Sequence, residues 1–399
     1  MELALQFGHG MMEHCRVLVG QWGGAPVILS PRDLSNEQMA RLSRDLGERG
    51  GTVFLDPQLY VPDCDHSRLT AHSFWPRVPE YWRDPGELKR VIGELVGLNN
   101  ELHTPLLISP APLVSAISDD ILQAINASLE ELGRLGVPGR SVLATVALSS
   151  DAVRNEDRAE MLSDAIEGWD VAGIYLVAEH PNSEYLVTDP MWIARVLDIV
   201  AGAGLVGKMV AIGYCTHQML IAATAGASII ASGTWMNVRS FSPKKFDEPD
   251  EDEISRRATW YYAPHLMTEY KVPYLDIAQK QSKLPLLQAP ASIDGRFAAA
   301  LFSGAQPTTV GFGESDAFRH YLHCMWQQVG AAKEGTFQET VRRHEQLLNA
   351  AESTLRDLRK VHIVGQGRDF WDSLDANRAA LALLNSTRGT VLAREWRNL

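Results

Sequence analysis

Two acidic side chains follow separate apolar segments, and one of them has an amide and an aromatic ring close by in the sequence. In FLDPQLY (54–60), Asp56 follows an apolar run, and Gln58 and Tyr60 come after it. Glu179 follows a second apolar run, IYLV. Carboxylates accept N–H groups and an aromatic ring stacks on a flat one, so the set predicts a pocket for a flat polar ligand. Each residue also has a structural interpretation, since Asp56 precedes a proline and could begin a turn.

The apolar segments that precede these acids belong to a series of seven. The series is APVILSP (25–31), TVFLDPQLY (52–60), TPLLISPAP (104–112), SVLATVAL (141–148), AGIYLVAE (172–179), KMVAIGYC (208–215) and ASIIASG (227–233). Such continuous runs are typical of strands buried on both faces of a parallel sheet. Helical stretches separate them, at 115–135, 153–168 and 190–204 for example. Because no glycine-rich first turn of the dinucleotide-binding type is present, we predict an α/β fold of the (β/α)8 TIM barrel class, not an open sheet.

One intervening helix carries a clear start signal. In SNEQMARLSRDLGERGG, Ser35 and Gln38 have the spacing of a capping box. Met39, Leu42 and Leu46 share one face, and glycines follow the segment. The pattern predicts an amphipathic helix packed on the barrel.

A barrel of this class carries its ligand-binding groups at the carboxyl ends of the strands. This end therefore collects Asp56 and Glu179 as candidate catalytic residues. The candidate ligand-binding residues at the same end are Gln58, Tyr60, Ile212, Gly213, Ser232 and Thr234. Tyr214, Cys215, Thr216, His217 and Trp235 are further side chains expected there. A reactive role for Cys215 is the weaker interpretation, because no base partner is fixed in the sequence.

The order of these segments resembles the tRNA-guanine transglycosylase superfamily over about residues 25–345. FLDPQLY is similar to that family's TDSGGFQ-type segment, which puts Asp56 on its base-proximal aspartate and Tyr60 on its stacking aromatic. The segment ending in AGIYLVAE resembles the one that closes with the family's GGLAVGE, so Glu179 matches its glutamate. AIGYCTHQMLIAATAGASIIASGTW resembles MGVGTPEDLLEAVALGVDMFDCV and places Ile212 on the other face of the base. HYLHCMWQQVGAAKEGTFQETV is similar to the family's closing helices.

The sequence also departs from the family. The resemblance puts Ala231 where the family has its nucleophilic aspartate, and a methyl group cannot attack a sugar. Ala147 stands in place of the glutamine that reads the base. The family's zinc cluster has no counterpart, because no cysteine lies in 216–323. No metal and no cofactor are expected.

The chain divides into a barrel over 1–345, with a loop-rich insertion at 236–290, and a helical extension over 346–399. Two helices hinged at Gly335 are expected from about residue 315 onward. In the insertion, WYYAP (260–264) is unusually apolar for an exposed segment. Its rings either form a contact surface or fold back onto the barrel.

Composition narrows the classes of partner. The net charge of −12 argues against strong unaided binding to a phosphate backbone. The four scattered cysteines do not form a disulfide framework. No apolar run is long enough to cross a bilayer, and the N-terminus does not resemble a secretory signal, so no membrane partner and a cytoplasmic location are expected. The local basic groups are Lys244, Lys245, Arg256, Arg257, Arg342, Arg343, Arg394 and Arg397.

Three functions remain open. The first is a transglycosylase-like protein that binds or exchanges a nucleobase or 7-deazapurine in nucleic-acid modification or anti-phage defence, pentosyltransferase-like if it is active. The second is a non-catalytic subunit that acts through protein partners. The third is a barrel enzyme that binds FMN or phosphate through backbone amides near GYC and AGASIIASG. The first two imply RNA, DNA or a modified protein as partner and a homo- or hetero-oligomer.

Overall fold

The computed structural model describes residues 1–155, 158–247 and 258–399 and has a sheet of eight parallel strands at its centre. Every strand is short and almost wholly buried, as expected where helices cover the outside and side chains fill the inside. The strands are β1 (Glu2–Gln6), β2 (Pro26–Leu29), β3 (Thr52–Leu55), β4 (Leu107–Ile108), β5 (Val142–Leu148), β6 (Gly173–Ala178), β7 (Met209–Ile212) and β8 (Ile229–Ser232).

The sheet is nearly closed into a barrel. Its strand order is β3-β2-β1-β8-β7-β6-β5-β4, and every neighbouring pair is parallel. The two end strands, β3 and β4, lie in contact. Just beyond them, the N–H of Leu113 donates to the carbonyl of Tyr60 at 2.8 Å. The predicted TIM-barrel class is confirmed.

Seven of the eight strands lie in the predicted apolar runs. Each predicted apolar run contains one of β2–β8, but β1 was not predicted. Its sequence, ELALQ, begins and ends with polar residues and contains only three apolar ones. β1 nevertheless occupies the middle of the sheet, where Leu5 is in register with Val27 of β2 and Ser232 of β8. Asp56 therefore follows the third strand.

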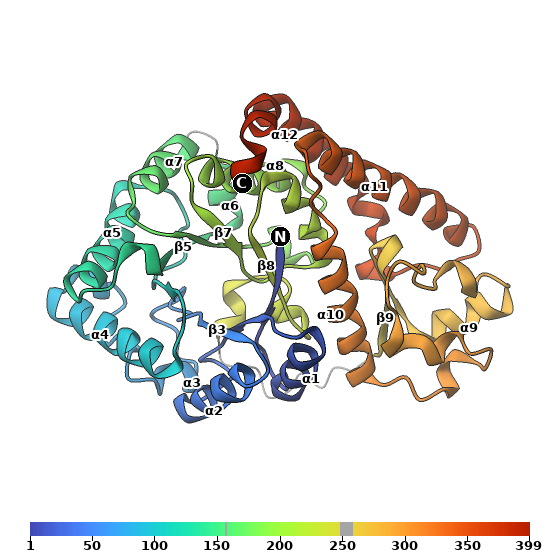
Figure 1. The fold of residues 1–399 in the computed structure, drawn as a ribbon, viewed down its shortest axis with the longest axis horizontal. Coiled ribbons are helices and arrows are strands. Elements are labelled where there is room, and N and C mark those ends of the chain that lie inside the picture. Colours follow the sequence, from blue (N-terminus) through green and yellow to red (C-terminus); the bar gives the residue numbers. More distant parts are fainter. Residues whose placement is uncertain (156–157, 248–257) are drawn as a thin grey trace.

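Helices surround this sheet (Figure 1). The capping box of Ser35 and Gln38 is present at the start of the second helix, and Met39, Leu42 and Leu46 are buried as predicted. The stretch expected at 153–168 belongs to two helices on either side of 156–157, which lie outside the described residues. The helices of this part are α1 (Met12–Trp22), α2 (Asn36–Gly47), α3 (Ser67–Thr70), α4 (Pro85–Leu102), α5 (Asp119–Arg134), α6 (Ser150–Arg154), α7 (Ala159–Gly168) and α8 (Pro190–Leu205).

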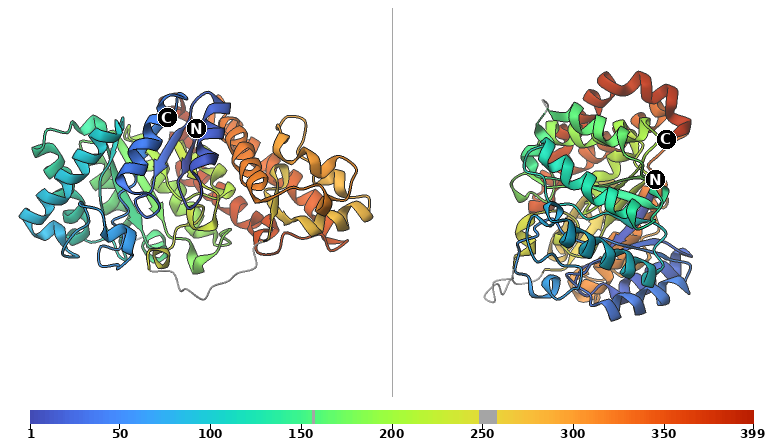
Figure 2. Two further views of the ribbon diagram at one scale, coloured as in Figure 1. Left: turned by 90° about the horizontal axis from the view of Figure 1, so that it is seen from below. Right: turned by 90° about the vertical axis from the view of Figure 1, so that its left-hand side faces the viewer.

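The elements after the barrel strands are the antiparallel pair β9 (Trp260–Ala263) and β10 (Thr268–Lys271), α9 (Val272–Lys280), α10 (Glu314–Gly330), α11 (Phe337–Arg359) and α12 (Leu374–Glu395). The insertion and α11 lie beside the barrel, while α10 packs on β1 and α1 of the barrel (Figures 1 and 2). Gly335 lies between α10 and α11, so the predicted pair of helices with a break at this glycine is confirmed. α12 packs on α8. None of the helices in the described ranges is long and apolar enough to cross a membrane.

The WYYAP segment folds back onto the protein. Tyr261 and Tyr262 are buried in β9. Tyr261 stacks on His320 with ring centroids 5.0 Å apart, and Tyr262 lies at the same distance from Tyr321, both on α10. The two tyrosines therefore provide no exposed contact surface, and oligomerisation stays a prediction without this support.

Candidate active site

The Asp56 carboxylate is fully buried where the chain leaves β3. Its Oδ1 accepts the hydroxyl of Tyr60 at 2.8 Å and the backbone N–H of Gln58 at 3.0 Å. Its Oδ2 accepts the hydroxyl of Tyr214 at 2.8 Å and lies 3.3 Å from that of Tyr175. A carboxylate has about four lone-pair positions, so the protein itself uses the acceptor capacity of Asp56. These five residues are the Asp56 cluster.

Two members of the Asp56 cluster have a left-handed backbone, with φ of 57° at Gln58 and 56° at Tyr214. This conformation is uncommon outside glycine and persists where the surrounding structure holds it. Gln58 Oε1 accepts from the Ser30 hydroxyl and the Arg32 N–H, both at 3.1 Å. Its Nε2 donates to the Tyr214 hydroxyl at 3.0 Å. Hydrogen bonds around the Asp56 carboxylate thus hold both residues in an unfavourable backbone conformation.

Aromatic rings enclose the Asp56 cluster. Tyr60 meets Phe241 and Phe246 edge to face, with ring centroids 5.0 and 5.6 Å apart. Phe241 also contacts the ring of Tyr214 at 5.3 Å. The ring of Tyr60, predicted to stack on a ligand, is therefore surrounded by side chains of the protein in this conformation.

Burial raises the pKa of the Asp56 carboxyl from its ordinary 3.8 to about 6, because hydrogen bonds from Tyr60, Tyr214 and Gln58 offset only part of the cost of burying charge. Burial and the nearby carboxylate raise the pKa of the three tyrosines well above 10. The hydroxyls consequently stay protonated and donate. A carboxyl with a pKa near 6 can gain or lose a proton close to neutral pH, as general acid–base chemistry requires.

Gly213 makes room for Tyr175. A Cβ atom on Gly213 would lie 2.3 Å from the Tyr175 hydroxyl oxygen. That hydroxyl also lies 3.2 Å from Gln6 Oε1, so its single proton is shared between Gln6 and Asp56. Tyr175 is therefore the weakest of the four donors to Asp56, and it occupies space that any larger residue at 213 would fill.

Gly213→Ala should lower the free energy of unfolding by about 1–3 kcal/mol, the usual cost of overfilling a packed site. Urea denaturation provides the measurement. Gly93→Ala on α4 is the matched control: a Cβ there meets nothing within 4 Å, so alanine should raise stability by up to about 1 kcal/mol. A stable Gly213→Ala protein would show that Tyr175 moves aside freely.

Glu179, the second predicted acid, is half-buried beyond β6. Its Oε2 accepts the N–H of Ser150 at 3.1 Å, at the first residue of α6. Its backbone forms a parallel bridge with Phe241, whose ring contacts Tyr60 of the Asp56 cluster. Phe241 therefore connects the surroundings of the two acids, and in the part of the chain that the structure describes no hydrogen bond joins them.

The other residues predicted for the site do not all lie at the Asp56 cluster. Ile212 and Ser232 are buried at the ends of β7 and β8. Thr234 is buried beyond β8, and its hydroxyl has no hydrogen-bond partner among the described residues. It lines a cavity next to Arg239 that contains no residue of the Asp56 cluster. Burial raises the pKa of the Cys215 thiol to about 12, which leaves it protonated and a poor nucleophile.

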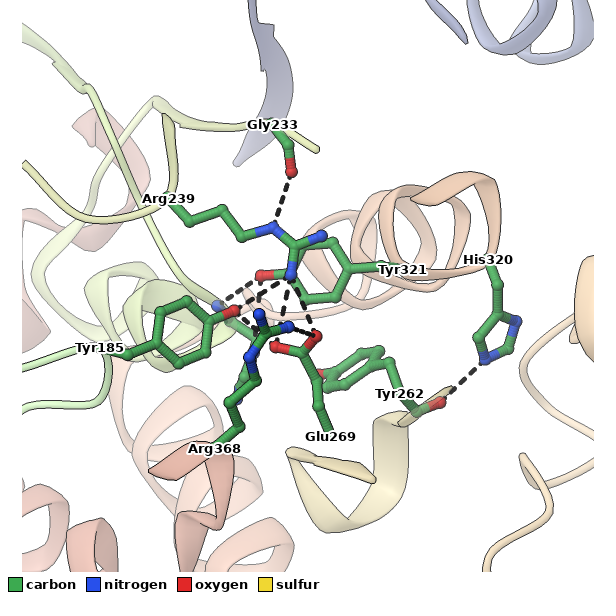
Figure 3. A network of polar contacts seen from close by, with 9 residues as sticks. Tyr185, Gly233, Arg239, Tyr262, Glu269, His320, Tyr321 and Arg368 are labelled. Atoms are coloured by element: carbon green, nitrogen blue, oxygen red, sulfur yellow. Dashed lines mark hydrogen bonds and ion pairs between the residues drawn. The ribbon is translucent and has the colours of Figure 1, made fainter. Parts of the chain in front are cut away.

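A second polar network connects the barrel to the insertion and the C-terminal region (Figure 3). Glu269 on β10 lies 3.1 Å from Arg239 Nη1 and 2.8 Å from Arg368 Nη1. The Tyr185 hydroxyl donates to Glu269 Oε1 at 2.6 Å. The Arg239 guanidinium lies over the Tyr321 ring, 3.5 Å from its centre. We call these five residues the Glu269 network.

The Glu269 network holds charges away from water. Burial alone would raise the pKa of the Glu269 carboxyl, but Arg368 and Arg239 outweigh that effect and hold it below its ordinary value. Glu269 is therefore ionised at neutral pH. Burial lowers the pKa of the neighbouring His217 to about 4 against the attraction of Glu269, so the imidazole is neutral.

Tyr175 and the Glu269 network were not predicted from the sequence. Tyr175 lies inside an apolar strand, where a tyrosine usually only packs. Glu269 is 30 residues from Arg239 and 99 from Arg368, so no motif joins them. Among the described residues, no group of three or more His, Cys, Asp or Glu side chains could hold a metal ion.

Comparison with known proteins leaves the family open. No family model matches the chain, and no curated protein matches it. A crystal structure of D-psicose 3-epimerase with D-tagatose from Clostridium cellulolyticum H10 is similar, with 12% identity, 60% of this chain and 89% of that chain covered, and a TM-score of 0.33. So is the carboxyl transferase domain of Rhizobium etli pyruvate carboxylase, with 9% identity, coverage of 97% and 60%, and a TM-score of 0.34. Likeness at this level carries no argument about function.

Proposed function

We propose that the chain binds a nucleobase or 7-deazapurine at the carboxyl end of the barrel, as a divergent transglycosylase-like protein of nucleic-acid modification or anti-phage defence. The observation that carries this proposal is the Asp56 carboxylate. It is fully buried, and its hydrogen-bond partners are three hydroxyls and one amide, none of them a cation. A buried carboxylate without a cation is costly, and perturbed groups of this kind gather at functional sites.

A ligand rich in N–H groups would take over part of this hydrogen bonding. Because the lone pairs of Asp56 are occupied, ligand binding requires one donor to leave. Tyr175 is that donor, since its proton is already shared with Gln6. The rings of Tyr60 and Phe241 would then have to part to accept a flat ring between them.

The proposal does not include base exchange by a nucleophile on β8, where the transglycosylase family has an aspartate. Ala231 is buried there and has no nucleophilic group. If the chain catalyses exchange, Asp56 or Glu179 must supply the chemistry. Asp56 fits proton transfer through its raised pKa, and Glu179 has one oxygen, Oε1, without a hydrogen bond to the described residues.

A non-catalytic subunit is the second candidate function. The observation that favours it is the saturation of Asp56 together with the aromatic side chains around it. In such a subunit the cluster would stabilise the barrel, and function would reside on the surface, toward a protein or nucleic-acid partner.

Titration of the purified protein with guanine and 7-deazaguanine separates the two functions. We expect saturable binding that Asp56→Asn weakens by about 1–3 kcal/mol, the cost of losing a hydrogen bond to a charged group. Asp63→Asn, an exposed acid of the same loop, is the matched control and should bind as the wild type does. Tyr175→Phe should bind at least as tightly as the wild type, because a competing donor is gone.

Two results would contradict the proposal. Equal affinities of the wild type and Asp56→Asn would remove Asp56 from ligand binding. No binding by either protein would favour the non-catalytic subunit.

A further inference from the structure

A small cavity lies between the barrel, the β9–β10 pair and α10. Thr234 and Met236 line it from beyond β8, Trp260 from β9, and Arg368 from the C-terminal region. The first turn of α10, with Glu314 and Ala317, forms another wall. The geometry points to a phosphate-binding site in this cavity, formed by Thr234, the two arginines of the Glu269 network and the start of α10.

Two of the four charged side chains around the cavity, Arg239 and Arg368, could bind an anion, while Glu269 and Glu314 are acidic. Arg239 and Arg368 share one buried carboxylate, Glu269, so the network carries one positive charge that it does not neutralise. Arg239 uses Nε and Nη1 in its hydrogen bonds, and in the described chain its Nη2 has none (Figure 3). Arg368 donates from Nη1 to Glu269, and its Nε and Nη2 donate to no described residue. Guanidinium groups with free N–H donors are the usual partners of phosphate oxygens.

Thr234 supplies an independent observation. Its side chain is 2% exposed and lines the cavity. Among the described residues its hydroxyl has no hydrogen-bond partner, although an unsatisfied buried hydroxyl costs about 1–3 kcal/mol. A phosphate oxygen in the cavity would accept this hydroxyl. The unmet hydrogen bond therefore indicates a ligand.

The start of α10 completes the site. The helix runs over Glu314–Gly330, and Gly313 before it has no side chain to cap the first N–H groups. Asp316 in the first turn accepts the N–H of Gly313 at 3.2 Å, and the Ala317 N–H donates to the Gly313 carbonyl, so the N–H groups of residues 314–316 are the ones without a helical partner. The N-terminus of a helix carries a partial positive charge and free N–H donors, both of which favour phosphate. Barrel proteins often bind phosphate beyond their last strands at the start of an additional helix, and this cavity has that position beyond β8.

The size of the cavity limits what it can hold. Its volume is about 40 Å³. One water needs about 10–15 Å³ by the same measure, so the cavity accepts one small group and not a whole nucleotide. Met236 at its rim is 41% exposed, which leaves the cavity next to solvent. We therefore infer that the bound group is a free phosphate or the terminal phosphate of a larger ligand.

Glu314 opposes this binding. It is half-buried on the wall of the cavity and forms no ion pair with a described residue. A carboxylate there repels an incoming phosphate. Its removal should therefore strengthen phosphate binding, which a merely structural role of the cavity would not predict.

Calorimetric titration with inorganic phosphate, without any nucleobase, tests the site. Chloride at matched ionic strength gives the background. We expect saturable binding by the wild type, binding at least about tenfold weaker in Thr234→Val, and binding severalfold tighter in Glu314→Gln. Arg134→Gln, an exposed arginine on α5, is the control for net charge and should bind as the wild type does.

The variants also test whether the protein remains folded. Thr234→Val has the shape of the native side chain and removes an unsatisfied hydroxyl, so its stability without phosphate should equal or exceed that of the wild type. Wild-type heat signals no larger with phosphate than with chloride would overturn the inference. So would equal phosphate affinities of the wild type, Thr234→Val and Glu314→Gln. Nucleobase binding at Asp56 is measured separately, so neither test decides the other.

Discussion

Replacing Glu269 with glutamine should lower the free energy of unfolding by about 3–5 kcal/mol, the typical cost of breaking a buried ion pair. The carboxylate is 3% exposed and lies between two guanidinium groups, 3.1 Å from Arg239 and 2.8 Å from Arg368. Arg239 is 2% exposed and cannot turn to water when its partner is lost. A neutral amide leaves that charge buried and uncompensated.

Chemical denaturation measures the effect, and the chain offers a matched control. Glu130 pairs with Arg134 on α5, where both side chains are about two-thirds exposed, at 66% and 64%. Glu130→Gln should cost about 0–1 kcal/mol, since water screens the pair. If Glu269→Gln does not fold, Arg368→Gln provides the smaller perturbation. It removes one guanidinium, 17% exposed, and leaves Glu269 paired with Arg239.

A loss below about 1 kcal/mol in Glu269→Gln would contradict this account. It would show that water or a rearranged backbone replaces the carboxylate, so that the Glu269 network does not hold the barrel, the β9–β10 pair and the C-terminal region together.

The barrel was predictable because its strands are buried on both faces. Seven continuous apolar runs each contain a strand, and a capping box marks the start of α2. β1 escaped prediction because Glu2 and Gln6 bound a run of only three apolar residues. Gln6 is fully buried and lies within hydrogen-bond distance of Tyr175 in the barrel interior. A polar strand residue of this kind is recognisable only when its distant partner is known.

The candidate site was predictable in part. The spacing in FLDPQLY predicted that Asp56, Gln58 and Tyr60 lie together. The structure confirms this, because their contacts are between residues close in the sequence. The predicted pocket for a flat ligand requires free oxygens on the Asp56 carboxylate. Tyr175 and Tyr214 fill those positions from 119 and 158 residues away, which no local pattern can reveal.

The titration of Asp56 should lower the free energy of unfolding as the pH rises, which is the opposite of the usual effect of a carboxyl group. A carboxyl whose pKa rises on folding from 3.8 to about 6 binds more protons in the native state throughout that interval. Its contribution to stability is therefore complete below about pH 4 and is lost as the pH rises through about 6. The expected loss is about 3 kcal/mol, from 1.36 kcal/mol for each pH unit of that interval.

The wild type and Asp56→Asn, measured in parallel from about pH 4 to about pH 7, isolate this contribution. Other acids, such as Glu269 with its lowered pKa, stabilise in the opposite direction, but they titrate equally in both proteins. The difference in unfolding free energy, wild type minus variant, should thus decline as the pH rises. Infrared absorption of the protonated carboxyl, present at pH 5 in the wild type and absent in the variant, is the second readout. Parallel stability curves without that absorption would mean that the four donors hold Asp56 ionised, and its role as a proton donor near neutral pH would have to be given up.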